Sequence, residues 1–110
     1  MRIATFAAAL GLMLGIVSSS VAKQSKAKTH TVTIEEMRFQ PAMLVVAPGD
    51  TVVWINKDLV AHTATSQAGG FDSNVILASD SWRYTVQKKK GDFAYICTLH
   101  PAMKGTLSVK

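Results

Sequence analysis

Four side chains that can bind a soft metal ion stand in two short parts of the sequence. Cys97, the only cysteine, is followed by His100 and Met103, and His62 lies well upstream. A thiolate, two imidazoles and a weakly bound thioether form the trigonal site that holds blue copper for electron transfer. The pattern predicts one copper ion per chain that cycles between Cu(I) and Cu(II), bound by His62, Cys97, His100 and Met103.

The spacing of the last three residues favours a single tight loop. Only two residues separate Cys97 from His100, and two more separate His100 from Met103. These intervals are too short for separate elements, and Pro101 stiffens the turn by fixing its own φ and restricting His100. We therefore expect His62 to come from a neighbouring strand or its end. We also expect it to be the buried imidazole.

Each of these residues also has a structural interpretation. A lone cysteine is often a small buried hydrophobe, a single histidine is more often structural than ligating, and methionine usually fills a core. The conjunction of types and spacing favours the metal site over these alternatives.

The run from Tyr95 to Met103 resembles the ligand loop of the cupredoxins, small blue copper proteins, and its short spacing is similar to that of the amicyanins. The resemblance covers the chain after about residue 30 and includes these further segments: 39–41, 48–54, 56–58, 61–63 and 71–73. It implies a Greek-key β-sandwich, with His62, Cys97 and His100 as strong ligands and Met103 as a long axial one. It also implies redox partners, with an amine dehydrogenase as donor and a c-type cytochrome as acceptor.

The sequence departs from the family pattern at two places. Many members carry Asn directly after the first histidine ligand, where it ties the two ligand segments together, whereas this chain has Thr63. A threonine hydroxyl can do similar work. The stretch from Lys88 to Asp92 replaces a usually shorter turn. Neither departure changes a metal ligand.

Short β-type runs alternate with turn signals, and no long segment shows helical periodicity. This pattern predicts one all-β sandwich of about seven to eight strands. Alternation places Val32 and Ile34 in the core and Phe93, Tyr95 and Cys97 on one face. A short helical turn between residues 70 and 80 stays open. The expected strands are 31–35, 43–46, 51–55, 62–65, 82–86, 93–97 and 104–110.

The N-terminal segment has the features of an export signal. Arg2 precedes an apolar run, and Ser20-Val21-Ala22 forms a small-residue cleavage site. We expect a signal peptide at 1–22, a flexible tail at 23–29 and one copper-binding domain at 30–110. The exported protein is then periplasmic, monomeric and not inserted in the membrane; a retained membrane anchor is the alternative. A single cysteine excludes an internal disulfide, an iron–sulfur cluster and a zinc site of several thiolates.

The chain is basic, with a formal net charge of +5. The run Lys88-Lys89-Lys90 predicts an exposed hairpin turn, with a docking patch as the alternative. A basic surface can steer an acidic redox partner. Nucleic acid is not expected, because an exported chain without an aromatic stacking motif offers little for it to bind.

Around His100 the neighbouring residues are apolar. We expect Leu99, Pro101 and Ala102 to form a small partner-facing patch through which electrons enter and leave, and acid to protonate His100 in competition with Cu(I). The alternative function is a periplasmic copper carrier or scavenger without electron transfer, and a zinc-loaded or metal-free sandwich is a third. An enzyme is least favoured, because protein ligands fill all four positions.

Overall fold

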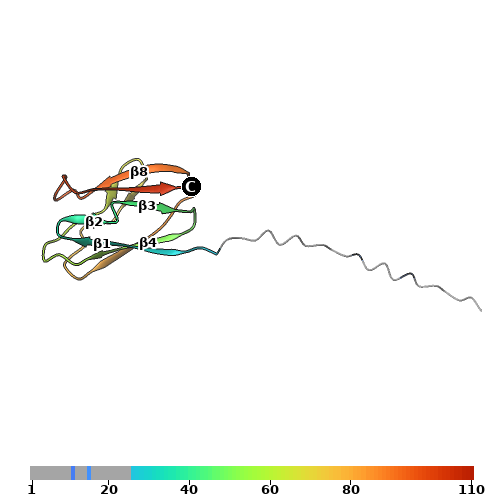
Figure 1. The fold of residues 1–110 in the computed structure, drawn as a ribbon, viewed down its shortest axis with the longest axis horizontal. Coiled ribbons are helices and arrows are strands. Elements are labelled where there is room, and N and C mark those ends of the chain that lie inside the picture. The colour runs from blue at the N-terminus through green and yellow to red at the C-terminus, as the bar shows by residue number, and fades with distance from the viewer. Residues whose placement is uncertain (1–10, 12–14, 16–25) are drawn as a thin grey trace, which may run out of the picture.

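A computed structural model describes Gly11, Gly15 and residues 26–110. The expected signal peptide, apart from the two glycines, and residues 23–25 of the expected tail lie outside the described residues. The described domain is built from two layers of strands (Figure 1). Over the stretches that the structure covers, no helix is long and apolar enough to cross a membrane.

Nine strands form two sheets in the described part of the chain. The four-stranded sheet has the order β2 (Arg38–Gln40), β1 (Thr29–Glu35), β4 (Thr51–Asn56), β7 (Ser81–Thr85). The five-stranded sheet has the order β3 (Met43–Val46), β9 (Lys104–Val109), β8 (Gly91–Ile96), β5 (Thr65–Ser66), β6 (Phe71–Asp72). The all-β sandwich is confirmed. The expected seven to eight strands become nine because β2 and β6, with three and two residues, are too short to show alternation.

Strand directions define two ends of the sandwich. Strands β1 and β4 run parallel, and β8 runs antiparallel to β9. The ends of β1, β4 and β8 therefore lie at one end, which we call the Cys97 end. Their starts lie at the opposite end, together with the last residues of β3, β7 and β9.

The core lies between the sheets, where alternation places it. Val32 and Ile34 are fully buried, as is Trp54, whose ring meets that of Tyr95 edge to face at 5.5 Å between centroids. Leu107 from β9 completes this layer. The same alternation along β8 buries Tyr95 and then Cys97, so the inward sulfur expected from the sequence is confirmed.

A glycine lets the Tyr95 ring pack against β9. Gly105 is the cross-strand partner of Tyr95, and a Cβ atom at this position would collide with the tyrosine ring. The Tyr95 ring therefore occupies the space that the side chain of any larger residue at position 105 would fill. This contact fixes the position of Tyr95, which lies two residues before Cys97, and so helps to set where the sulfur points.

Two local expectations are wrong. Residues 62–65 do not form a strand: His62 makes only an isolated bridge with Ile76, and β5 begins at Thr65. The run Lys88-Lys89-Lys90 is exposed as expected, but it is not a hairpin turn, because it connects β7 of one sheet to β8 of the other. Residues 70–80 contain β6 and the bridge at Ile76, without a helical turn.

Candidate metal centre

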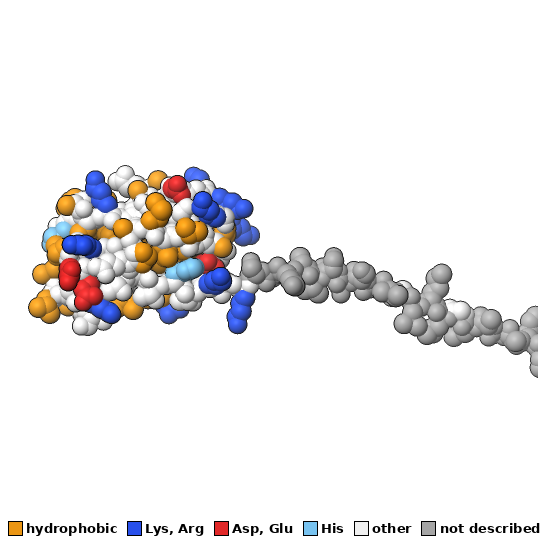
Figure 2. Space-filling view, in the orientation of Figure 1, with side chains coloured by type: hydrophobic (Ala, Val, Ile, Leu, Met, Phe, Trp, Pro, Cys, Tyr) orange, Lys and Arg blue, Asp and Glu red, His pale blue; other side chains and the backbone are white. Residues whose placement is uncertain are grey.

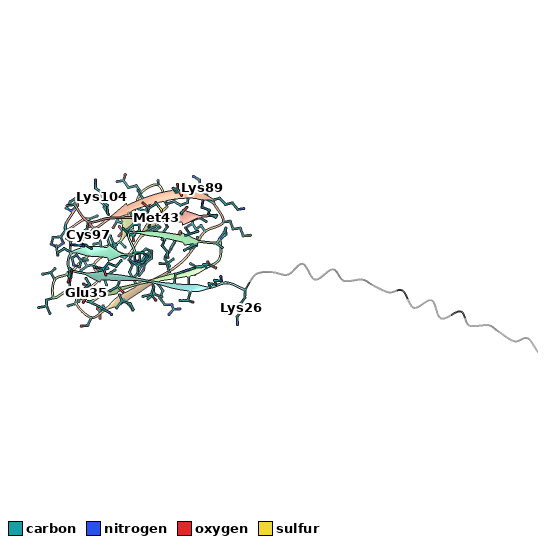
Figure 3. All side chains as sticks on the ribbon, viewed as in Figure 1. Lys26, Glu35, Met43, Lys89, Cys97 and Lys104 are labelled. Atoms are coloured by element: carbon teal, nitrogen blue, oxygen red, sulfur yellow. The ribbon has the colours of Figure 1, made fainter. Side chains whose placement is uncertain are left out.

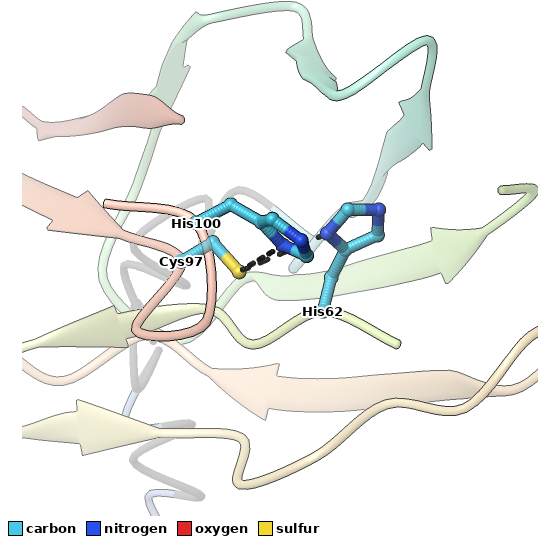
Figure 4. A group of neighbouring side chains, drawn as sticks. All are labelled: His62, Cys97 and His100. Atoms are coloured by element: carbon cyan, nitrogen blue, oxygen red, sulfur yellow. Dashed lines mark hydrogen bonds between the residues drawn. The ribbon is translucent and has the colours of Figure 1, made fainter. Parts of the chain in front are cut away.

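Three side chains converge at the Cys97 end of the sandwich (Figure 4). The sulfur of Cys97 lies 3.7 Å from Nδ1 of His62 and 3.8 Å from Nδ1 of His100. One donor atom from each residue lies within 4.8 Å of the others. Cys97 and His62 are fully buried, whereas His100 is half-buried. The sequence prediction that His62 is the buried imidazole is confirmed.

These separations fit a single metal ion. An ion bonded to nitrogen at about 2.0 Å and to sulfur at about 2.3 Å, in a trigonal plane, spaces its sulfur and nitrogen donors about 3.7 Å apart. The two measured sulfur-to-nitrogen distances are 3.7 and 3.8 Å. The side chains are thus already arranged around a common centre, and their soft and borderline donors suit copper.

A closed loop carries three of the expected ligands. The backbone N–H of Cys97 donates to the carbonyl of Met103 at 3.1 Å, and the N–H of Met103 donates to the carbonyl of His100 at 2.9 Å. Met103 is buried in the core beside Cys97. The prediction of one tight turn is confirmed, while the ligand roles of the four residues, including Met103 as the axial one, remain predictions.

His62 is oriented by a carboxylate on its far side. Its Nε2 donates to Oδ2 of Asp58 at 2.8 Å, which leaves the lone pair of Nδ1 facing the sulfur of Cys97. A hydrogen bond from the second ring nitrogen commonly fixes the tautomer of a ligating histidine. Asp58 therefore prepares His62 to bind a metal through Nδ1.

Asp58 is itself held in place by hydrogen bonds. Its carboxylate accepts the backbone N–H groups of Glu36 and Met37 at 2.8 and 3.0 Å, in the turn between β1 and β2. Burial raises the pKa of Asp58, but the bonds from Met37, His62 and Glu36 outweigh it and hold that pKa below its ordinary value. The group facing His62 is therefore an ionised acceptor.

A fully buried amide shapes the chain between β4 and His62. The Asn56 side chain donates to the carbonyls of Val60 and Ile76 at 2.9 and 3.0 Å, and its oxygen accepts the N–H of Asp58 at 3.0 Å. Every polar group of this amide is thus used to position the segment that presents His62.

A family model described as a cupredoxin-like domain matches residues 6–109. The chain belongs to this family. Among the relatives of this cupredoxin is amicyanin-alpha of Methylorubrum extorquens, 29% identical over 98% of this chain and 92% of that protein. The amicyanin of Paracoccus denitrificans is 30% identical over 72% of this chain, and the match spans 63% of its length.

Solved structures agree with this assignment. A methionine mutant of amicyanin in its Cu(I) form superposes on the cupredoxin with a TM-score of 0.67 at 26% identity, covering 74% of this chain and 82% of that one. A copper-containing nitrite reductase from Thermus scotoductus gives a TM-score of 0.68 at 28% identity, but the match covers only 22% of that larger chain. The amicyanin-like resemblance seen in the ligand loop is confirmed.

In this cupredoxin, Thr63 joins the two ligand-bearing segments. Its backbone N–H donates to the sulfur of Cys97 at 3.3 Å, and its hydroxyl oxygen accepts the N–H of Thr98 at 2.8 Å. The hydroxyl also lies 3.0 Å from that of Thr98 and 3.1 Å from that of Thr65. A threonine thus links the two ligand-bearing segments, as expected for its hydroxyl.

Apolar side chains are exposed near the candidate site. Leu99, Pro101 and Ala102 are exposed around the half-buried His100, where the sequence placed them. The segment before His62 adds Leu59, which is 97% exposed, and Val60. This second contribution was not anticipated.

Sequence reasoning also missed Asn56 and Asp58. A polar pair in a turn before an apolar run is typical of ordinary loops, so composition gave no reason to separate them from other turn residues. The available signal was the spacing of Asp58 four positions before His62, together with the backbone N–H groups that a short turn leaves to be satisfied.

Proposed function

We propose that this cupredoxin binds one copper ion through His62, Cys97, His100 and Met103 and carries single electrons between redox partners. The observation that carries this proposal is that the Cys97 sulfur lies 3.7 and 3.8 Å from the two Nδ1 atoms, the separation that one trigonal ion sets between its sulfur and nitrogen donors. Copper supplies a one-electron couple between Cu(I) and Cu(II) when it is bound in such a site.

The protein's own contribution is to hold the donors nearly fixed. Cys97 is buried and accepts one backbone N–H from Thr63. Asp58 holds the His62 ring, and the backbone bridge to Ile76 holds the main chain of His62. An electron carrier needs little rearrangement between its two oxidation states, and a rigid ligand set supplies that condition. A carrier that delivers metal instead needs ligands that open readily.

Electrons are proposed to pass at the exposed edge of His100, within the patch formed by Leu99, Pro101 and Ala102. Small apolar contacts of this kind suit transient complexes that turn over quickly. The resemblance to amicyanins supports an amine dehydrogenase as donor and a c-type cytochrome as acceptor. The protein acts as a carrier in this scheme, not as an enzyme.

The visible spectrum of the oxidised, copper-loaded protein tests the proposal. A blue electron-transfer site gives an intense band from the copper–thiolate bond, whereas a pale copper-loaded protein indicates a copper carrier without electron transfer. Cys97→Ser should abolish the band while the fold is retained. Met103→Leu should keep the blue colour and shift the reduction potential, and Met43→Leu, at an exposed methionine, is the matched control that should do neither.

The proposed location is the periplasm, reached by cleavage after Ala22, with residues 23–29 as a tail before a monomeric domain. In the structure β1 already begins at Thr29, where the expected tail ends. The mass of the protein purified from a periplasmic extract tests the cleavage site. Recovery of the uncleaved chain in the membrane fraction would contradict the location.

A further inference from the structure

Six lysines gather at the end of the sandwich opposite the metal centre. They come from three parts of the chain: the segment before β1, the connection between β7 and β8, and the residue after β9. All six are exposed, and we call their surface the lysine end: Lys26, Lys28, Lys88, Lys89, Lys90 and Lys110. Figure 3 shows Lys26 and Lys89 on the side of the domain away from Cys97, and Figure 2 shows the blue side chains gathered there.

Two carboxylates offset part of this charge. Asp50 and Asp92 are the acids of the lysine end within the described residues, so six lysines face two acids there. Asp50 is buried and accepts the N–H groups of Lys28 and Ala47, and Asp92 accepts the hydroxyl of Ser108 at 2.6 Å. The other five acids lie outside this end: Glu35, Glu36, Asp58, Asp72 and Asp80.

The position of this charge argues against a role in bringing a redox partner to the metal. A partner attracted to the lysine end would be held at the opposite end of the domain from His100, where electrons are proposed to leave. The charge is better suited to holding the whole domain against an anionic surface. Such attachment would leave the metal centre facing the solution.

We propose that the lysine end binds the anionic headgroups of a lipid bilayer and presents the Cys97 end to soluble partners. All six cations are lysines, which act as point charges, rather than arginines that read carboxylates or phosphates in a fixed two-pronged geometry. Drawn from three segments, they give a broad surface rather than one binding groove. The orientation rests on the proposed function, whereas the binding does not.

An apolar cavity at the same end favours lipid over other polyanions. It has a volume of about 200 Å³ and is lined by rings and aliphatic groups that include Phe71, Tyr84, Phe93 and Leu107, with Lys89 beside them. A lipid can place part of an acyl chain there, while an acidic peptide or a nucleic acid has no long aliphatic group to offer. The large aromatic side chains of the domain pack in or against the core, so they provide no platform for stacking bases.

The test compares two variants that lose the same charge. One carries Lys88→Gln, Lys89→Gln and Lys90→Gln, and the control carries Arg38→Gln, Lys57→Gln and Arg83→Gln, at exposed cations outside the lysine end. The protein purified from the producing cells is sedimented with vesicles of phosphatidylcholine, with and without phosphatidylglycerol. Circular dichroism checks that both variants fold.

We expect binding only to vesicles that contain phosphatidylglycerol, and loss of that binding at high salt. Each lysine near an anionic bilayer strengthens binding by about fivefold, so the lysine variant should bind about 100-fold more weakly, and the control within about fivefold of the original. Equal weakening of both variants would overturn the proposal in favour of a net-charge effect. Absence of binding at low salt, equal binding to both vesicle types, or tighter binding to soluble polyglutamate than to vesicles would also overturn it.

Orientation is measured without relying on the metal. A polarity-sensitive dye on Gln87→Cys, beside the lysine run, should shift its emission when anionic vesicles are added, and the same dye on Leu59→Cys should not. Cys97 is fully buried and stays unlabelled in the folded protein. A shift at Leu59→Cys would overturn the orientation. Because neither readout involves copper colour, failure here and failure of the electron-transfer proposal are distinguishable.

Discussion

The two ends of this sandwich contain the same hydrogen-bonding device with different consequences. At the Cys97 end, Asp58 accepts two backbone N–H groups and Nε2 of His62. At the lysine end, Asp50 accepts the N–H groups of Lys28 and Ala47 and Nε2 of His30 at 2.8 Å. In both places an aspartate bonds to backbone N–H groups and to a histidine side chain and so joins two segments of the chain. This arrangement therefore stabilises the fold at both ends, whether or not the histidine can bind a metal.

The surroundings of the second ring nitrogen make the difference. Nδ1 of His62 faces the sulfur of Cys97, and the ring is fully buried. His30 is partly exposed, and it is not among the metal-binding side chains that cluster in the described residues. The contrast shows why a lone histidine in a sequence says little, whereas a histidine brought to a thiolate and another imidazole predicts a metal.

Loss of the Asn56 amide at the Cys97 end should lower stability most. Asn56→Ala leaves the carbonyls of Val60 and Ile76 and the N–H of Asp58 without their partner. The bond to Ile76 is buried and the other two are partly buried, so with a cost of about 1–3 kcal/mol per buried group left unpaired the free energy of unfolding should fall by about 3 kcal/mol. Urea denaturation of the metal-free protein measures it. Gln87→Ala, which removes an exposed amide, is the control, and equal losses would contradict the role of Asn56.

Replacing each aspartate in turn tests the difference between the two ends directly. Asp58→Ala should lower copper affinity by about 10–100-fold, because the partner that orients a ligating histidine is lost. Asp50→Ala should lower stability and leave copper affinity unchanged, because His30 is not a ligand. Competition with a chelator of known affinity measures both variants. Asp58→Asn keeps an acceptor for His62 and should restore part of the affinity; similar losses for both alanine variants would refute the distinction.

The link between the two ligand segments should contribute less. Thr63→Val keeps the shape of the side chain but removes the acceptor of the Thr98 N–H, so we expect a loss of about 1–2 kcal/mol in unfolding free energy. The N–H bond from Thr63 to the sulfur stays, so the blue band should persist. Thr63→Ser retains the hydroxyl and should remain close to the original protein. A full loss of colour in Thr63→Val would give the hydroxyl a larger role at the metal than its contacts indicate.

Much of the site could be predicted because its chemistry depends on residue type and short spacing. Cys97, His100 and Met103 share one loop whose length leaves few conformations, and alternation along β8 determines where the sulfur points. His62 was selected by its residue type and by the resemblance of residues 61–63 to the family. The strand expected around it is wrong, since its backbone pairs with Ile76 only in an isolated bridge. The bonds from Glu36 and Met37 to Asp58 could not be predicted, because they require knowing that the turn after β1 meets the segment after β4.

For the fold as well, features set by neighbouring residues could be predicted, and features set by contacts between distant segments could not. Strands of four or more residues reveal their buried face through alternation, as β1 does with Val32 and Ile34. Strands of two or three residues carry no such pattern, and which sheet each strand joins depends on contacts between distant segments. For this reason the prediction of a hairpin turn at Lys88-Lys89-Lys90 is wrong: the run crosses from one sheet to the other.

The response of stability to acid concerns the lysine end. Hydrogen bonds from the N–H groups of Lys28 and Ala47, and then from His30, lower the pKa of Asp50 to about 2 from an ordinary value of 3.8. A carboxyl with a depressed pKa in the folded state contributes stability that is complete above its unfolded pKa and is lost as pH falls through the folded one. The contribution of Asp50 should therefore be present above about pH 4 and disappear toward pH 2. Denaturation of the metal-free Asp50→Asn variant and of the original protein across this range measures it. The difference between the two should shrink as the pH falls, because protonation of Asp50 removes the same charge as the substitution; a constant difference would show that the Asp50 contacts act through shape alone.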